Sequence, residues 1–323
     1  MIATMVGNYP KIADRPGGQA YRQALHRLDR GEIDQAELAR VAEAVTREVI
    51  DEQVRAGLDL LTDGMIRWED NQTYFARRLE GVTLAGLIRY FDTNTYYRQP
   101  VIRGPIRWPG PITVDDWRFA AAYSPRPVKA ILPGPYTLAR LSRSEYYTDR
   151  RRLTLALAEA VNHEARALAA AGAPLIQIDE PAITWYKQDW PLCREALLRV
   201  AEGVGAPLAL ATWFGDVVGL EGFFALPFQV FSLDFVMGPR NWELVERFPA
   251  DRTLGFGLLD ARNIKLESVD YLIASLRRVA RHVPLERLHV HPSCGLEYLP
   301  REYAYAKLER MVAALRGLGE EAA

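Results

Sequence analysis

The residues that could do chemistry in this sequence lie where apolar strands end in charged side chains. In the segment Leu175–Pro181 an apolar strand runs into two adjacent carboxylates, Asp179 and Glu180. A charge at the end of a buried strand is unfavourable unless it is paired or used. The alternative interpretation is a solvated strand end whose acids cap the next segment.

Polar or thiol residues follow most of the other apolar runs as well. They are Asn8, Asp63, Thr212 to Asp216, Asp234, Asp260 and Cys294, whereas the run at 128–132 ends in Pro133-Gly134. If the strands form a closed parallel barrel, their carboxyl ends converge on one face. Helix caps would explain several of these residues one at a time. The whole collection favours a functional pocket at that face.

Cys294 stands in a Pro-Ser-Cys-Gly turn just after a strand, and His291 lies three residues earlier. A lone cysteine is often a small buried hydrophobic residue. A turn beyond a strand also permits thiolate chemistry or metal binding. Zn²⁺ accepts sulfur, nitrogen and oxygen ligands in a tetrahedron, so a Cys/His/carboxylate zinc site is a reasonable hypothesis.

The elements that must position these residues alternate between strand and helix. Apolar runs predict strands at 2–6, 58–64, 128–132, 175–180, 208–212, 230–234, 254–258 and 288–291. Helical periodicity predicts helices near 34–56, 149–171, 191–204, 267–282 and 301–316. Eight strands separated by helices predict a single-domain (β/α)8 barrel over residues 1–323. Residues 92–118, rich in Pro, Gly, Tyr and Trp, are interpreted as an inserted hairpin arm.

Composition narrows the class of protein. The chain has 323 residues, of which 49% are hydrophobic and 25% charged, as in a globular protein with a large core. A formal net charge of −1 gives no general attraction to nucleic acid or anionic membranes. Two cysteines cannot form a disulfide framework, and no run approaches about 18 apolar residues. We therefore expect a soluble cytoplasmic protein that binds neither nucleic acid nor membrane.

Several motifs, taken in order, resemble one family, the cobalamin-independent methionine synthases, and in length the chain resembles their short single-barrel members. The motifs cover nearly the whole chain. They are Val6-Gly7-Asn8-Tyr9-Pro10, Thr62-Asp63-Gly64, Leu132 to Thr137, Ile176 to Pro181, Leu226-Pro227, Arg262-Asn263-Ile264 and Ser293 to Leu296.

The resemblance implies transfer of a methyl group to the thiol of homocysteine, from a methyl-folate or a methyl-corrinoid protein. It also implies a Zn²⁺ ion that activates the thiol, since metal coordination deprotonates a thiol of ordinary pKa. Asp179 matches the carboxylate that binds the substrate's ammonium group. Cys294 matches the last zinc ligand, and Asp234 stands where the family has a zinc-binding glutamate.

The sequence departs from the family pattern at important positions. The tip after the fifth strand is Thr212-Trp213-Phe214, where catalytic members have a His-x-Cys pair of zinc ligands. Met65 replaces a glutamate that helps to bind the amino acid, and Asn8 replaces a serine. Only if His291 joined the metal shell would Asp234, His291 and Cys294 supply the three ligands that a catalytic zinc needs.

These considerations give a set of expected site residues. Asp179 and Cys294 are expected to be catalytic, and Asp234, His291 and Cys294 to hold Zn²⁺. The expected substrate-binding residues are Asn8, Asp63, Met65, Tyr136, Asp179, Glu180 and Thr212. The alternatives are a family member that has lost zinc-dependent methylation and binds a small ligand, or one that catalyses another reaction.

Overall fold

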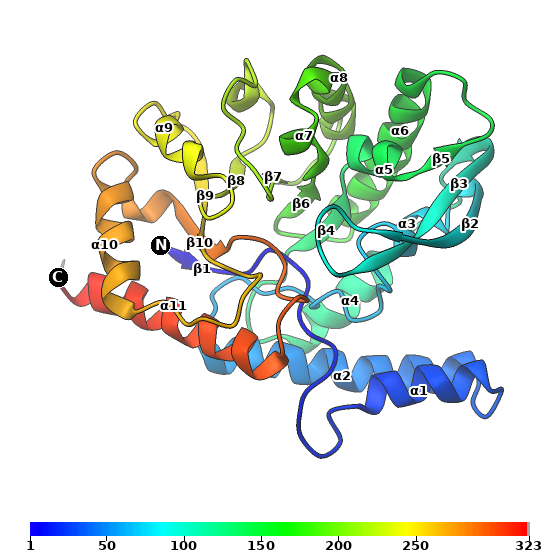
Figure 1. Ribbon diagram of the computed structural model, residues 1–323, viewed down its shortest axis with the longest axis horizontal. Coiled ribbons are helices and arrows are strands. Elements are labelled where there is room, and N and C mark those ends of the chain that lie inside the picture. The colour runs from blue at the N-terminus through cyan, green and yellow to red at the C-terminus, as the bar shows by residue number, and fades with distance from the viewer. Residues whose placement is uncertain (322–323) are drawn as a thin grey trace.

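The computed structural model describes residues 1–321 and shows a parallel sheet rolled into a barrel (Figure 1). Seven strands are hydrogen-bonded in the order β1-β10-β9-β8-β7-β6-β4. They are β1 (Ile2–Ala3), β4 (Ala130–Pro133), β6 (Ile176–Asp179), β7 (Leu208–Ala211), β8 (Val230–Asp234), β9 (Thr253–Leu259) and β10 (Leu288–Pro292).

The ring is completed by the segment predicted as the second strand. Here only single-residue bridges form, from Leu60 to Thr4 beside β1 and from Leu61 to Val128 just before β4. The main chain also connects these segments, since Lys129 N donates to Leu61 O (3.0 Å). The predicted barrel of eight parallel strand positions is therefore confirmed, with a second strand much shorter than expected.

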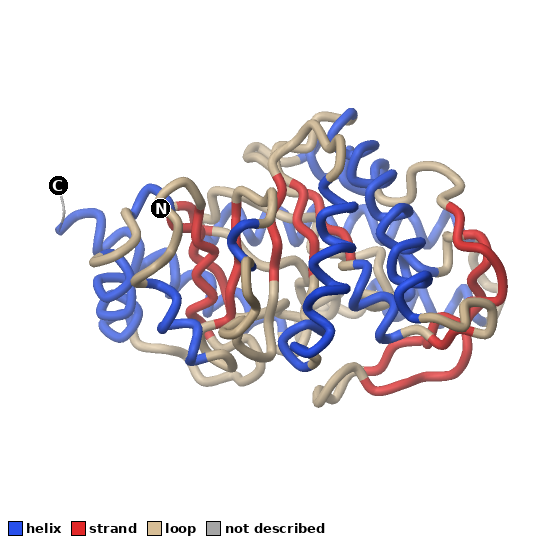
Figure 2. Tube along the Cα trace, turned by 90° about the horizontal axis from the view of Figure 1, so that it is seen from above, coloured by secondary structure: helices blue, strands red, loops and turns tan. Residues whose placement is uncertain are grey.

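Long helices cover the outside of the barrel (Figures 1 and 2). Those predicted from periodicity are confirmed to within a few residues, except that the last one extends further. They are α2 (Gln35–Ala56), α6 (Arg150–Ala170), α8 (Trp190–Ala201), α10 (Val269–Ala280) and α11 (Arg301–Glu321). Helix α2 begins at Asp34, whose carboxylate accepts from Glu37 N (2.8 Å), and ends at Gly57 with φ 92°.

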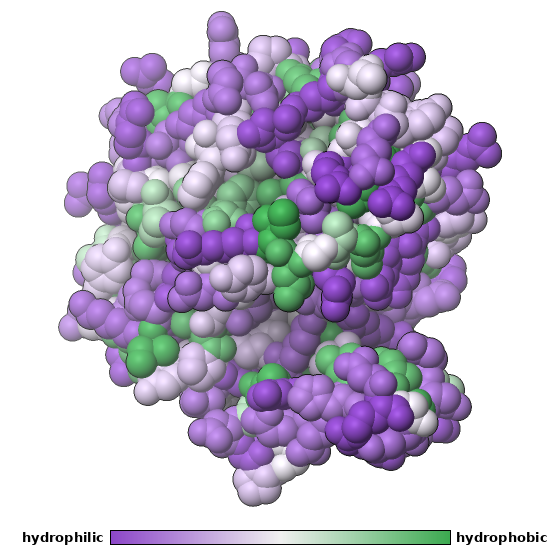
Figure 3. All heavy atoms as spheres, turned by 45° about the vertical axis from the view of Figure 1, so that its right-hand side comes forward, coloured by the Kyte–Doolittle hydropathy of each residue, from purple (hydrophilic) through white to green (hydrophobic). Residues whose placement is uncertain are grey.

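Shorter elements lie between these. The short helices are α1 (Ala20–Asp29), α3 (Thr73–Ala76), α4 (Val114–Tyr123), α5 (Pro135–Leu141), α7 (Ala182–Trp185) and α9 (Trp242–Val245). No helix within residues 1–321 is both long and apolar enough to cross a bilayer. The face shown in Figure 3 is mostly hydrophilic, with hydrophobic residues in several separate patches.

The inserted arm begins earlier than predicted. It is an antiparallel hairpin of β2 (Glu80–Arg89) and β3 (Tyr96–Arg107), to which β5 (Arg143–Ser144) adds a short parallel strand. Gly81 permits the irregular pairing near its base, because it has φ 82° and a Cβ there would lie 2.4 Å from Pro105 O. Residues 92–118 thus contain the turn, β3, the segment that returns from the arm and the start of α4. Figure 2 shows the hairpin at one end of the molecule.

The segment that returns from the arm is anchored by a buried carboxylate. Glu164 of α6 accepts hydrogen bonds from Trp108 Nε1 (2.6 Å) and from Thr113 N (2.7 Å) and Oγ1 (2.9 Å). The Glu164 side chain has no exposed surface, so these bonds are shielded from water. They fix the arm against the barrel beside the residues discussed next.

Candidate active site

Asp179, the last residue of β6, lies at the end of a buried hydrogen-bond chain inside the barrel. Lys129 Nζ donates to Gln177 Oε1 (2.7 Å), and Gln177 Nε2 donates to Asp179 Oδ1 (2.6 Å). Gln177 also donates to Val6 O (2.8 Å), which joins β6 to the segment after β1. Asp179 is 6% exposed. Among the described residues, Oδ2 accepts no hydrogen bond, so one carboxylate oxygen is available to a ligand.

Burial shifts the protonation of both ends of this chain. It raises the pKa of Asp179 to about 8, against the opposing effects of Gln177 and Lys129. It lowers the pKa of Lys129 to about 7, against the attraction of Asp179. A carboxyl group that is largely protonated at neutral pH becomes ionised when a cation is placed beside it. The site therefore gains from a bound ammonium group.

Lys129 was not among the residues expected in the site, although the sequence contains a signal for it. In the segment Val128–Leu132 it occupies the same strand face as Ile131, since side chains alternate along a strand. A strand buried on both faces leaves no solvent for such a side chain. The lysine must therefore point into the barrel, where it is 5% exposed.

Glu180 and Tyr136 hold the scaffold together and do not face a cavity. The Glu180 carboxylate is fully buried and accepts from Tyr136 N (3.1 Å), Thr137 N (2.5 Å) and Thr137 Oγ1. The Tyr136 hydroxyl donates to Asp189 (2.6 Å). Gly134 allows this arrangement, because a Cβ there would lie 2.2 Å from Glu180 Oε2. The polar groups of these two side chains, both expected to bind substrate, therefore form hydrogen bonds within the protein.

Asp63, Met65 and Thr212 also do not line a cavity large enough for a ligand. Asp63 and Met65 line a cavity of only about 10 Å³ beside Lys129, and Asp63 Oδ1 accepts from Met65 N (2.9 Å). Burial raises the pKa of Asp63 to about 6. Thr212 is 2% exposed, with its hydroxyl 3.5 Å from Ser232 O.

Asn8 is the expected site residue that reaches a cavity large enough for a ligand. Beside the barrel mouth lies a cavity of about 630 Å³, which we call the side cavity. Asn8 Nδ2 donates there to Glu297 Oε1 (3.0 Å). Asp179, Asp234 and Cys294 were expected to line one common cavity, but none of them lines the side cavity. Glu297 and the neighbouring tyrosines were not expected, because only folding brings the hairpin turn beside the segment after β10.

His291, one of three expected metal ligands, uses both of its ring nitrogens within the protein. Nδ1 lies 2.7 Å from the Pro292 carbonyl, which can only accept, so Nδ1 carries the proton. Nε2 then accepts from the Ser232 hydroxyl (2.5 Å). Burial lowers the pKa of His291 to about 3, which keeps the ring neutral. Neither nitrogen has a free lone pair for a metal.

The Asp234 carboxylate likewise accepts hydrogen bonds from backbone amides. Its Oδ1 accepts from Val236 N (2.8 Å) and Met237 N (2.9 Å), and its Oδ2 accepts from Phe214 N (3.0 Å). Burial raises its pKa to about 6, and those three amide donors oppose the shift. This carboxylate fixes the loops after β7 and β8, including Phe214 with its left-handed φ of 66°.

Cys294 is 1% exposed, and burial, together with the nearby Glu297 and Asp234 charges, raises the pKa of its thiol well above the ordinary value. Within residues 1–321 no three His, Cys, Asp or Glu side chains gather closely enough to hold a metal. The predicted site of Asp234, His291 and Cys294 is therefore not formed, and these residues do not fit Zn²⁺.

We expect the purified protein to contain much less than one zinc ion per chain, measured by inductively coupled plasma mass spectrometry after dialysis. Cys294→Ser should leave that content unchanged, because the thiol is not a ligand. One zinc per chain that is lost in Cys294→Ser would show that the loops rearrange to bind metal.

The chain is a (β/α)8 barrel, and these residues lie at the carboxyl ends of its strands, the face at which barrels of this type carry their active sites. The family "Cobalamin-independent synthase, Catalytic domain" matches residues 1–198 and 216–316. A methionine synthase of Saccharolobus solfataricus is 32% identical over 322 residues, which are 98% of this chain and 95% of that protein. One of Sulfolobus acidocaldarius is 32% identical over 98% of this chain and 92% of its own length. The chain belongs to the cobalamin-independent methionine synthase family, as its motifs predicted.

Solved structures show the same fold. A B12-independent methionine synthase from Shewanella sp. W3-18-1, in complex with selenomethionine, superposes with a TM-score of 0.83. The two sequences are 22% identical, and the match covers 99% of this chain and 98% of that one. A putative B12-independent methionine synthase from Listeria monocytogenes gives a TM-score of 0.77 at 18% identity, over 98% of this chain and 99% of that one.

The family match is interrupted where the site departs from the family pattern. Residues 199–215, outside the match, contain β7 and the tip Thr212-Trp213-Phe214-Gly215. This is the tip where the resemblance leads one to expect a His-x-Cys pair. The same tip is held by Asp234, which accepts from Phe214 N. This hydrogen bond therefore links two departures from the zinc pattern: the tip without His-x-Cys, and the aspartate in place of a glutamate.

Proposed function

We propose that this chain is a methyltransferase that methylates the thiol of homocysteine and so forms methionine. The observation that carries the proposal is Asp179, a carboxylate at the barrel mouth with one oxygen free of protein partners and no direct ion pair. Methionine synthases similar over nearly the whole chain support it. The donor would be a methyl-folate or a methyl-corrinoid protein, and the cytoplasm the place of action.

In this proposal Asp179 binds and orients the amino acid through its ammonium group. The pair replaces the proton that burial places on the carboxyl group, so the substrate offsets the desolvation of Asp179. Gln177 keeps Oδ1 in place and leaves Oδ2 to the ligand. Since the residues present do not fit Zn²⁺, no step of the proposed reaction runs through a metal.

The proposal is tested by incubating the protein with homocysteine and methyl-labelled donors of both classes, followed by mass spectrometry of methionine. We expect labelled methionine with one donor class. Asp251→Asn serves as the control for Asp179→Asn, because Asp251 is an exposed residue paired with Arg252 on the surface. Absence of methionine with either donor, while homocysteine binds, would contradict the proposal.

A second candidate is a barrel of this family that binds an amino-acid-like ligand without methylating it. The specific observation in its favour is that His291 and Asp234 are hydrogen-bonded in ways that leave nothing for a metal. This second candidate uses the same Asp179 site. It predicts a different result in the labelling experiment: homocysteine would bind, but no labelled methionine would form.

A further inference from the structure

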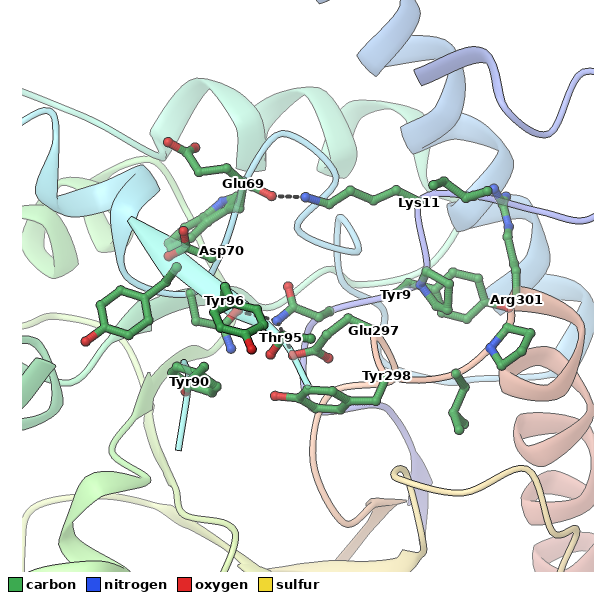
Figure 4. Close-up of a pocket in the computed structure, with 18 of the residues that line it drawn as sticks. Tyr9, Lys11, Glu69, Asp70, Tyr90, Thr95, Tyr96, Glu297, Tyr298 and Arg301 are labelled. Atoms are coloured by element: carbon green, nitrogen blue, oxygen red, sulfur yellow. Dashed lines mark hydrogen bonds between the residues drawn. The ribbon is translucent and has the colours of Figure 1, made fainter. Parts of the chain in front are cut away.

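The side cavity joins segments that are far apart in the sequence. It lies between the loop after β1, the segment around Trp68, the turn of the β2–β3 hairpin and the loop from Glu297 into α11 (Figure 4). Its volume of about 630 Å³ is within the range of small-molecule sites, roughly 300–1,000 Å³. It adjoins the Asp179 site: Asp179 is not among its lining residues, but the Glu297 and Tyr90 side chains of its wall are close enough to Asp179 to interact with it electrostatically.

Aromatic rings form much of the cavity wall. Tyr90 packs edge-to-face with Tyr97 (6.2 Å between centroids) and with Phe214 (6.3 Å). Phe214 in turn packs against Tyr298 (6.2 Å). Trp68, on another side, is stacked on Tyr74 (4.8 Å). These contacts hold the rings in place, so the wall is formed before any ligand arrives.

Three residues of the lining have a buried polar atom that makes no hydrogen bond of good geometry among residues 1–321: the Tyr9 and Tyr90 hydroxyls and Glu297 Oε2. Glu52 lies near the first, Asn71 near the second and the Tyr298 hydroxyl near the third. Tyr90 is 5% exposed. Figure 4 shows the Glu297 carboxyl group beside the Tyr298 ring, facing the cavity. The absence of a side chain at Gly295 makes room for it, because a Cβ there would lie 2.1 Å from Glu297 Oε2. A ligand with polar or charged groups could satisfy these atoms.

No lysine or arginine within residues 1–321 forms an ion pair with Glu297, although Lys11 is close enough to attract its charge. Lys11 Nζ binds the Trp68 carbonyl oxygen, and Arg301 binds Glu52 (2.9 Å) and Glu48 (3.4 Å). The lining also contains the acids Asp14, Glu69, Asp70 and Glu302, against those two cations. An anionic ligand is therefore disfavoured, and a neutral apolar one would leave the carboxylate unpaired.

We propose that the side cavity binds an organic cation whose head is a methylated onium group, a quaternary ammonium or a sulfonium. Aromatic faces attract such heads, whose methyl groups cannot donate conventional hydrogen bonds and whose charge is diffuse. Glu297 supplies the counter-charge, and the Tyr90 hydroxyl can bind a polar substituent of the same ligand. The remaining volume leaves room for a chain longer than the head group.

Choline binding, measured by isothermal titration calorimetry, tests this proposal. Two comparison ligands separate the causes: 3,3-dimethylbutan-1-ol has the same shape without charge, and ethanolamine has the charge without methyl groups. We expect choline to bind at least about ten-fold more tightly than either. Glu297→Gln, which keeps the shape of the side chain, should weaken choline binding about ten-fold or more. Glu243→Gln, at an exposed glutamate paired with Arg240, is the matched control.

Equal affinity for choline and its neutral analogue, no choline binding at millimolar concentration, or unchanged binding in Glu297→Gln would each overturn the proposal. Ethanolamine binding as tightly as choline would also overturn it, since the aromatic wall would then contribute nothing. If Glu297→Gln does not fold, as judged by circular dichroism, Tyr298→Leu is measured in its place with the same expected loss. The readout is binding of choline, so its failure leaves the methyl-transfer experiment unaffected.

Discussion

Asp179→Asn is expected to weaken the binding of homocysteine and methionine by about 2–4 kcal/mol, because it removes the counter-charge of a desolvated ammonium group. The amide keeps nearly the same shape and can still accept from Gln177 Nε2, so the local hydrogen-bond chain should persist. The measurement is isothermal titration with homocysteine, with methionine and with a thiol that lacks the amino group. The last ligand should bind the variant and the natural protein equally.

The same substitution should not destabilise the fold. Burial raises the pKa of Asp179 to about 8, far above its value in an unfolded chain. The folded state then holds a proton that the unfolded state releases between about pH 4 and pH 8, so this group lowers stability as pH rises through that window. Asparagine has no such proton. Urea unfolding should therefore show that the free energy of unfolding of Asp179→Asn rises relative to that of the natural protein between pH 5 and pH 8. In the titration experiment, equal amino-acid affinity of the two proteins would contradict the role assigned to Asp179.

Glu180→Ala is expected to lower the free energy of unfolding by about 3–5 kcal/mol. It removes the acceptor of two backbone amides and one hydroxyl at Tyr136 and Thr137, all shielded from water. It also leaves a void between the end of β6 and the loop after β4. The measurement is equilibrium unfolding in urea at pH 7, read by circular dichroism and tryptophan fluorescence.

Two comparisons sharpen that result. Glu195→Ala removes the same number of atoms from an exposed glutamate paired with Arg151 and should change stability by about 0–1 kcal/mol. Glu180→Gln keeps one acceptor and should fall between alanine and the natural residue. A Glu180→Ala variant as stable as Glu195→Ala would show that the carboxylate does not support the β4 loop, and Glu180 would again be a candidate for substrate binding.

The sequence predicted the barrel because its pattern is local. Each strand shows an apolar run, and the ends of helix α2 are marked in the sequence by its capping residues, Asp34 and Gly57. The inserted arm was placed too late because β2 combines Gly81 and Gly86 with a run of mostly apolar residues, which fits neither a helix nor a regular strand. Its pairing with β3 depends on a bulge that only the folded chain reveals.

Site residues were harder to assign than strands. Asp179 could be predicted to have a raised pKa, since a carboxylate between Ile178 and Pro181 at a strand end is desolvated. The strand-end rule could not separate Asp179 from Glu180, because the two differ in which backbone amides lie within reach. The family resemblance suggested Asp234 as a metal ligand, and the sequence position near Cys294 suggested His291. In the structure their side chains are bonded to Phe214 N and Ser232 Oγ, which neighbouring strands bring to them. Contacts of that kind are not visible in one sequence.

Proton release on methionine binding tests the central claim most directly, because methionine carries the ammonium group and no thiol. Titration at pH 7 in two buffers of different ionisation enthalpy gives the number of protons released. Burial raises the pKa of the Asp179 carboxyl group to about 8, so it is largely protonated at pH 7 and is ionised by the bound ammonium; we therefore expect a net release of protons on binding at pH 7 that falls as the pH rises above 8. Binding without proton release, or the same release from Asp179→Asn, would contradict the assignment of Asp179 as the residue that binds the amino acid.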